Sequence, residues 1–207
     1  MKALIKTDLQ ELIKEGKQIK LELGCGQKKN PDRIAVDKLD QPHVDIVADL
    51  EEGLAFLPDG SVDEIHCTSV LEHIENFENL MRDIVRVLKE DGKAFVFVPH
   101  FSNPYFYSDY THKRHFGLYT FYYFVDTQKQ LKRKVPNFYS NVRINILRIK
   151  LIFRSPFWVS RQLKKLIGFI INSHPCIMEF YELHLCHLFP CYGVEIVFSP
   201  AYKCENK

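Results

Sequence analysis

Leu21-Glu22-Leu23-Gly24-Cys25-Gly26 stands where an apolar run that begins at Ile19 stops at two glycines. This pattern predicts a buried strand followed by a tight turn, because glycine permits positive φ values and has no Cβ atom. Backbone N–H groups in such a turn can approach a bound molecule closely. The pattern also fits an ordinary connection between a strand and a helix, so its meaning depends on the flanking sequence.

Two later apolar segments each end in a carboxylate. Residues 33–37 end at Asp37, and residues 44–49 end at Asp49. In nucleotide-binding α/β folds, an acid at the tip of the second strand receives the ribose hydroxyls. We therefore expect Asp37 to bind a ribose, and Asp49 to accept a hydrogen bond from an adenine amino group.

Strand and helix patterns alternate along the rest of the sequence, which predicts an open α/β sheet. Further strands are expected at residues 62–68, 93–99, 142–153 and 192–198. Helices are expected at residues 8–15, 76–89, 118–132, 157–172 and 176–188. The continuous apolar run at 93–99 is typical of a strand at the centre of a parallel sheet.

The composition is that of an ordinary globular domain, with 207 residues, 46% hydrophobic and 26% charged. No apolar run reaches the roughly 18–20 residues that cross a bilayer. The first residues lack the pattern of a signal peptide, so a cytoplasmic location is expected. The cysteines are scattered and are expected to be reduced thiols. They are Cys25, Cys67, Cys176, Cys186, Cys191 and Cys204.

Four segments resemble, in their order and spacing, the class I S-adenosylmethionine-dependent methyltransferases, and most closely the branch called methyltransferase domain 11. They are Glu22-Leu23-Gly24-Cys25-Gly26, Val36-Asp37, Ala48-Asp49-Leu50 and Ser69-Val70-Leu71-Glu72-His73-Ile74. The resemblance implies S-adenosyl-L-methionine as the cofactor and S-adenosyl-L-homocysteine as its product. It also implies an α/β fold with a Rossmann-like, doubly wound, seven-stranded sheet. That sheet would be mostly parallel with its last strand antiparallel, and a helical insertion at about 156–190 would separate the last two strands.

The resemblance also suggests which residues contact the cofactor. Gly24, Cys25 and Gly26 would admit its methionine part, with Glu22 near the amino group. Asp37 would take the ribose hydroxyls. The adenine would meet Asp49 and the Leu50 backbone, and the cavity wall would include Ser69 and Val70.

Charge divides the chain into two halves. Residues 1–99 hold 13 Lys and Arg against 20 Asp and Glu, whereas residues 100–207 hold 15 against 6. A single domain over 1–207 would then have a cofactor-binding half at 1–99 and an acceptor and lid half at 100–207. The basic half either meets an anionic partner or neutralises the acidic half across their interface.

Methyl transfer from a sulfonium needs an aligned acceptor and, for a hydroxyl, a group that takes its proton. The pattern Asp109-x-Thr111-His112-x-Arg114-x-Phe116 resembles a segment that many members of this branch carry over the cofactor's methionine end. His112 is the predicted general base and His100 the second choice. Arg114 would pair with an acceptor carboxylate or phosphate, or with a structural acid. A purely structural His112 that orders the loop is the alternative.

No metal site is predicted. Histidines and cysteines gather late in the chain, but their spacings match no C-x-x-C or H-x-x-x-H pair. They are His174, Cys176, His184, Cys186, His187 and Cys191. The segment 157–172 is apolar with a basic minority, so it can pack as a lid or dimer helix or lie in a membrane interface. The sequence favours packing.

The sequence thus predicts a methyltransferase that acts on oxygen of a small molecule, a glycan or a lipid-linked acceptor, as a monomer or homodimer. Thr68-Ser69-Val70-Leu71 stands where amino-methylating enzymes carry Asn/Asp-Pro-Pro-Tyr/Phe, which disfavours the base-flipping DNA class. One alternative is an RNA methyltransferase, suggested by the basic second half with Lys132-Arg133-Lys134 and Phe138-Tyr139, although nucleic acid is not the expected partner. The other is a non-catalytic S-adenosylmethionine-binding protein.

Overall fold

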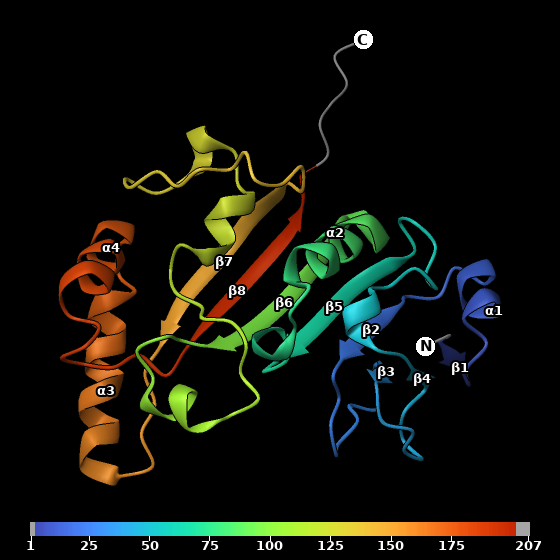
Figure 1. Ribbon diagram of the computed structural model, residues 1–207, viewed down its shortest axis with the longest axis horizontal. Helices are drawn as coiled ribbons and strands as arrows, with labels where there is room; N and C mark the ends of the chain where they lie inside the picture. Colours follow the sequence, from blue (N-terminus) through green and yellow to red (C-terminus); the bar gives the residue numbers. More distant parts are fainter. Residues whose placement is uncertain (1–2, 202–207) are drawn as a thin grey trace.

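A single eight-stranded sheet organises the computed structural model, which describes residues 3–201 (Figure 1). The strand order is β1-β4-β3-β2-β5-β6-β8-β7. The strands are β1 Leu4–Ile5, β2 Lys20–Leu23, β3 Ile34–Asp37, β4 Ile46–Val47, β5 Val62–Thr68, β6 Leu88–Pro99, β7 Ile144–Ile152 and β8 Gly193–Pro200. The predicted Rossmann-like α/β sheet is confirmed.

The strand order reverses beside β2, which pairs in parallel with both β3 and β5. The chain runs outward from β2 through β3 to β4, and then crosses back to place β5 on the other side of β2. Ligands of open α/β sheets bind beyond the carboxyl ends of the strands at such a reversal. The turn at Gly24–Gly26 lies at this point.

The late strands pair antiparallel, as expected. Strand β8 lies between β6 and β7 and is antiparallel to both. Helices α3 (Trp158–Ile171) and α4 (Pro175–His184) form the insertion between β7 and β8, and they lie together at one end of the molecule (Figure 1). The helices of the first half are α1 (Leu9–Lys14) and α2 (Phe77–Val87), and α2 buries Leu80, Met81 and Ile84 in the core.

The structure corrects several predicted boundaries. The sheet has eight strands rather than seven, because Leu4 and Ile5 pair antiparallel with β4. The third strand is limited to residues 46–47. Strand β6 begins at residue 88, so the helix that was expected at 76–89 ends at Val87.

The predicted helix at 118–132 is wrong. Two short 3-10 helices, η4 (Thr120–Phe124) and η5 (Thr127–Lys129), stand in its place. The Gln130 side chain donates to the carbonyls of Tyr122 and Val125, which a continuous helix would use as acceptors for its own N–H groups. The aromatic residues of η4 also have low helix propensity, and three of them, Phe121, Tyr122 and Phe124, are buried by packing.

Five cysteines within residues 3–201 are free thiols, as expected for the reduced form, and Cys204 lies outside the described residues. Within the described part of the chain, every helix is too short or too polar to cross a bilayer.

Candidate functional site

The turn after β2 requires glycine at its first position. Gly24 has φ +65°, and a Cβ atom there would clash with the Cγ2 atom of Val70, which follows β5. Gly26 has φ +59° with open space around it. The two predicted cofactor segments, residues 24–26 and 69–70, are therefore in direct contact at the point where strand order reverses.

Asp37 lies at the tip of β3 and holds the glycine turn. Its Oδ2 atom accepts a hydrogen bond from the Gly26 N–H (3.0 Å), and its Oδ1 atom accepts one from the Leu39 N–H (3.0 Å). His43 Nε2 contacts the Gly26 carbonyl at 2.8 Å. The Asp37 carboxylate, which was expected to bind the ribose, thus holds the glycine turn. The Asp37 side chain is only half-buried, so part of it is accessible to a ligand.

Glu22 and Asp49 both make structural contacts at the same edge. The Glu22 carboxylate accepts from the Asn30 N–H (3.0 Å) and the Arg33 guanidinium (3.3 Å), and so holds the connection between β2 and β3. Asp49 Oδ1 accepts from the Glu51 N–H and caps the 3-10 helix η1 (Leu50–Glu52), in which Leu50 is buried.

Cys25 lies between the two glycines of the turn. Burial, together with the negative charges of Asp37 and Glu22, raises the pKa of its thiol. The group therefore stays protonated at neutral pH, and a thiolate nucleophile is not favoured here.

Beyond β5 the backbone turns sharply and buries a carboxylate. Ser69 has φ +55°, an uncommon value for a residue with a side chain. Glu72, in the 3-10 helix η2 (Leu71–His73), is only 1% exposed. Burial raises its pKa to about 7, against the opposing effect of hydrogen bonds from its own backbone and from Ser69. Among the described residues, nothing hydrogen-bonds to Glu72 Oε2.

The segment that carries His112 lies directly over η2. The backbone N–H groups of Lys113 and Arg114 donate to the Glu72 carbonyl at 2.7 and 3.2 Å. The Arg114 guanidinium donates to the carbonyls of Ile74 and Glu75, so this arginine joins the two segments. Joining these segments is the structural role of Arg114, and its contact with an acceptor stays a prediction.

His112 and His73 lie beside the buried glutamate. Their ring centroids are 4.9 Å apart, and one ligand atom from each of Glu72, His73 and His112 lies within 4.8 Å of the other two. The sequence singled out His112, and the structure adds Glu72 and His73. The available signal was the polar pair Glu72-His73 inside the otherwise apolar segment 70–74, which stood out only as part of a family motif.

His100 is fully buried at the end of β6 and is bonded at both ring nitrogens. Nδ1 contacts the Ser102 hydroxyl at 2.8 Å, and Nε2 contacts the carboxylate of Glu182 on α4 at 2.9 Å. Both nitrogens are thus used by the protein. The structure gives His100 the role of joining β6 to α4.

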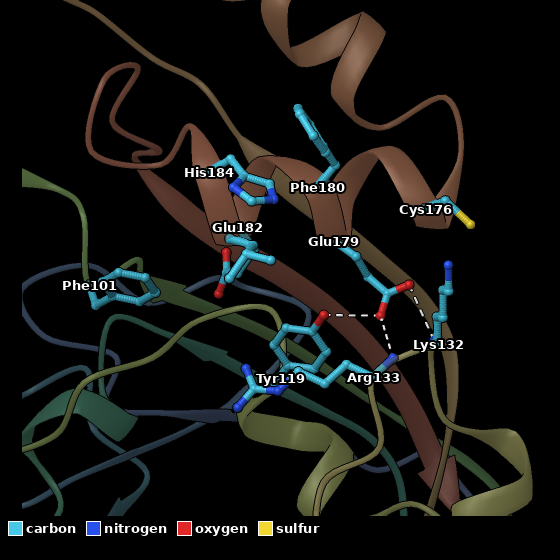
Figure 2. A pocket seen from close by; sticks show the side chains of 10 residues that line it. Phe101, Tyr119, Lys132, Arg133, Cys176, Glu179, Phe180, Glu182 and His184 are labelled. Carbon is cyan, nitrogen blue, oxygen red and sulfur yellow. Dashed lines mark hydrogen bonds between the residues drawn. The ribbon is translucent and has the colours of Figure 1, made fainter.

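A cavity of about 580 Å³ lies between α4 and the segments around Tyr119 and Arg133 (Figure 2). Glu179 accepts there from the Tyr119 hydroxyl (3.0 Å) and from the Arg133 N–H (2.8 Å). Burial and the Glu179 carboxylate raise the pKa of Tyr119. Phe101 and Glu182 line the side toward β6. Of the described residues, those predicted to contact the cofactor are not among the ones that line this cavity, so it lies apart from the predicted cofactor site.

Strand order, glycine turn and strand-tip carboxylates together define a Rossmann-like methyltransferase fold. Comparison with known proteins agrees. Residues 27–96 match the family model described as a methyltransferase domain. This match covers part of the first half of the chain, and it supports the similarity to class I S-adenosylmethionine-dependent methyltransferases of the methyltransferase domain 11 type, for which the cofactor is S-adenosyl-L-methionine.

Solved structures share the fold at low sequence identity. A methyltransferase of Archaeoglobus fulgidus is 19% identical with a TM-score of 0.51, covering 92% of this chain and 91% of its own. One from Mesorhizobium loti is 14% identical with a TM-score of 0.50, covering 87% and 89%. Coclaurine N-methyltransferase, solved with N-methylheliamine and SAH, is 13% identical with a TM-score of 0.51, covering 92% and 69%. Curated proteins gave no significant match.

Proposed function

We propose that this protein transfers a methyl group from S-adenosylmethionine to an oxygen atom of a small-molecule or glycan acceptor. The observation that carries the proposal is the cluster of Glu72, His73 and His112 at the carboxyl edge of the sheet. It follows β5 by a few residues, next to Val70, which contacts the glycine turn. An acceptor bound there would lie between these side chains and the cofactor.

The bound cofactor supplies an activated methyl group on a sulfonium, and the protein's own residues do the rest. Gly24 and Gly26 leave room for the protein backbone of the turn to contact the cofactor. Asp37 and Asp49 offer carboxylates at the strand tips. His112 Nδ1 lies 2.9 Å from the Phe106 carbonyl. Because a carbonyl can only accept, Nδ1 carries the proton, and in the neutral ring the lone pair is on Nε2. That atom is available to take the acceptor's proton.

The acceptor's setting is suggested by the exposed apolar side chains of the insertion. Trp158, Val159 and Phe169 on α3 are each more than 70% exposed, and Ile171 is the buried residue of that helix. Further exposed apolar residues nearby are Phe157, Leu163, Leu166, Ile170, Phe180, Leu183, Leu188 and Phe189. The exposed cations Arg161 and Lys165 lie on the same helix. A helix with Trp, Phe and Leu beside Lys and Arg suits an anionic membrane surface, so we include a lipid-linked glycan as acceptor and peripheral membrane contact through α3.

The proposal is tested by searching cell-extract fractions for the molecule that the protein methylates. Purified protein and methyl-labelled cofactor are incubated with separate soluble, membrane-lipid and RNA fractions of a cell extract, and labelled products are identified by mass spectrometry. A labelled O-methyl group in the soluble or lipid fraction supports the proposal. Label confined to RNA, or to nitrogen, overturns it in favour of the alternative acceptors, and cofactor binding with no label in any fraction supports a non-catalytic protein.

A further inference from the structure

Three potential metal ligands from two segments converge in the cluster beside the cofactor edge. Glu72 and His73 come from η2, and His112 comes from the segment that lies over it. One carboxylate oxygen and one nitrogen of each ring all lie within 4.8 Å of one another. Side chains at this separation can contact one ion with small rotations, since metal–ligand bonds of about 2.0–2.2 Å place adjacent ligands roughly 3 Å apart.

Both imidazoles are held in the form that binds a metal through Nε2. His112 Nδ1 donates to the Phe106 carbonyl (2.9 Å). His73 Nδ1 lies 2.9 Å from the Thr111 hydroxyl and 3.3 Å from the Thr111 carbonyl, so it also carries its proton on Nδ1. Metal-binding histidines typically donate their second ring N–H to a carbonyl or a similar acceptor, which fixes the ring and its tautomer.

A second hydrogen bond extends the support of His73. The Thr111 hydroxyl lies 2.5 Å from Asp109 Oδ1, and it can donate to that carboxylate while it accepts from His73. The chain from His73 through Thr111 to Asp109 orients the ring from behind. Asp109 Oδ2 also lies 3.5 Å from His112 Nε2, on the side where an ion would bind.

The third ligand is an unsatisfied buried carboxylate oxygen. Glu72 is 99% buried, and its Oε2 atom accepts no hydrogen bond from any residue in the range 3–201. Leaving a buried polar atom without a partner is costly, so native structures rarely do it without a reason. A cation between the carboxylate and the two rings would give this oxygen its partner.

We propose that Glu72, His73 and His112 bind one divalent transition-metal ion, with Zn²⁺ as the reference ion. Two imidazole nitrogens and one carboxylate oxygen form a ligand set suited to such ions, and three protein ligands leave at least one position open. The use of the ion in catalysis rests on the proposed function: it would hold the acceptor hydroxyl and favour loss of its proton. His112 would then act as a ligand, whereas without an ion it would act as the base.

Metal binding can be measured without any acceptor. The full-length protein is treated with a chelator, dialysed and titrated with Zn²⁺ in a calorimeter, and with Co²⁺ by absorption spectroscopy. We expect one site, a Co²⁺ spectrum without thiolate charge-transfer bands, and at least a tenfold loss of affinity in Glu72→Gln and in His73→Asn. His115→Asn is the matched control, because His115 is an exposed histidine of the same segment outside the cluster. It should bind like the wild type.

Unchanged affinity in folded Glu72→Gln and His73→Asn, or a thiolate band in the wild-type Co²⁺ spectrum, would overturn the metal site. If a variant fails to fold by circular dichroism, His112→Asn and the wild-type spectrum decide. Methyl transfer is assayed separately. Metal binding in the titration together with transfer that does not depend on metal leaves the site intact and removes its catalytic use. No binding of Zn²⁺ or Co²⁺ in the titration, with transfer still observed, removes the site and leaves the proposed function.

Discussion

Gly24 and Val70 are in such close contact that no other residue fits at position 24. The backbone of Gly24 is left-handed, and a Cβ atom would overlap the Val70 side chain. We expect Gly24→Ala to lower the free energy of unfolding by about 2–5 kcal/mol, because left-handed strain and overpacking both act. Gly26→Ala is the control, since Gly26 has the same handedness but open space around it. It should cost about 1–2 kcal/mol in the same denaturant titration. Equal losses in the two variants would show that Val70 does not restrict this turn.

Asp37 connects the turn to β3 through its bond to the Gly26 N–H. Removing the carboxylate in Asp37→Ala is expected to weaken binding of S-adenosylhomocysteine by roughly 1–3 kcal/mol, measured by calorimetry, because a charged acceptor for the ribose is lost. Asp32→Ala, which removes an exposed carboxylate of the same connection, should leave the affinity unchanged. Wild-type affinity in Asp37→Ala would exclude the ribose contact.

The first half of the chain could be predicted well because local sequence pattern determines it. Strands β2 and β3 coincide with apolar runs that end at a glycine and at a carboxylate, and they pair in parallel as the open sheet requires. The predicted helix at 118–132 failed because a single side chain, Gln130, competes for its carbonyls from within the segment. A residue pattern does not reveal such a contact.

The candidate site shows the same division. Gly24, Gly26 and Asp37 could be named from the sequence, since each lies at the end of a strand or within three residues after it. Glu72 and His112 are 40 positions apart in the sequence, and contacts between their segments bring them together, among them the hydrogen bonds from the Lys113 and Arg114 N–H groups to the Glu72 carbonyl. These contacts depend on tertiary structure, so the cluster could not be recognised before the fold was known.

Glu51 binds Lys113 in the segment over the cluster, and it should make the free energy of unfolding depend on pH. Burial alone raises the pKa of this carboxyl, but hydrogen bonds from the Glu75 and Asn76 N–H groups and from Lys113 outweigh it and hold the pKa below 4.5. A lowered folded-state pKa stabilises the fold above the unfolded value of 4.5, and this contribution is lost as pH falls through the folded-state pKa.

The difference in unfolding free energy between the wild type and Glu51→Gln should therefore be constant above pH 4.5 and shrink below it. Chemical denaturation over a pH series, with chelator present, measures this difference. Glu90→Gln changes an exposed carboxylate and serves as the control, with little effect at any pH. A difference for Glu51→Gln that grows as pH falls would contradict the assignment.

Trp158 is the only tryptophan of the chain and is 71% exposed on α3, so it reports directly on contact with a membrane. Its fluorescence should shift to the blue when vesicles of phosphatidylcholine and phosphatidylglycerol are added, and the shift should weaken as salt rises. Phe169→Gln keeps the reporter and removes an exposed apolar side chain, so it should bind vesicles several-fold less tightly. Leu39→Gln, which alters an exposed side chain at the other end of the sheet, should bind normally. A blue shift that depends on protein concentration without vesicles would instead indicate a homodimer through α3.

Substitution of His112 can show whether the cluster takes part in the reaction or only stabilises the fold. Its ring donates a hydrogen bond to the Phe106 carbonyl and makes a tilted contact with the Phe106 ring, so a structural role would appear as lost stability. Once an acceptor is found, His112→Asn should lower turnover about a hundredfold or more while cofactor affinity stays near the wild-type value, because the proton acceptor or metal ligand is lost and the glycine turn is not. His115→Asn, which also removes a histidine packed on Phe106, should retain most activity. A fall in melting temperature that accounts for the loss, with turnover per folded molecule unchanged, would assign His112 to the fold alone.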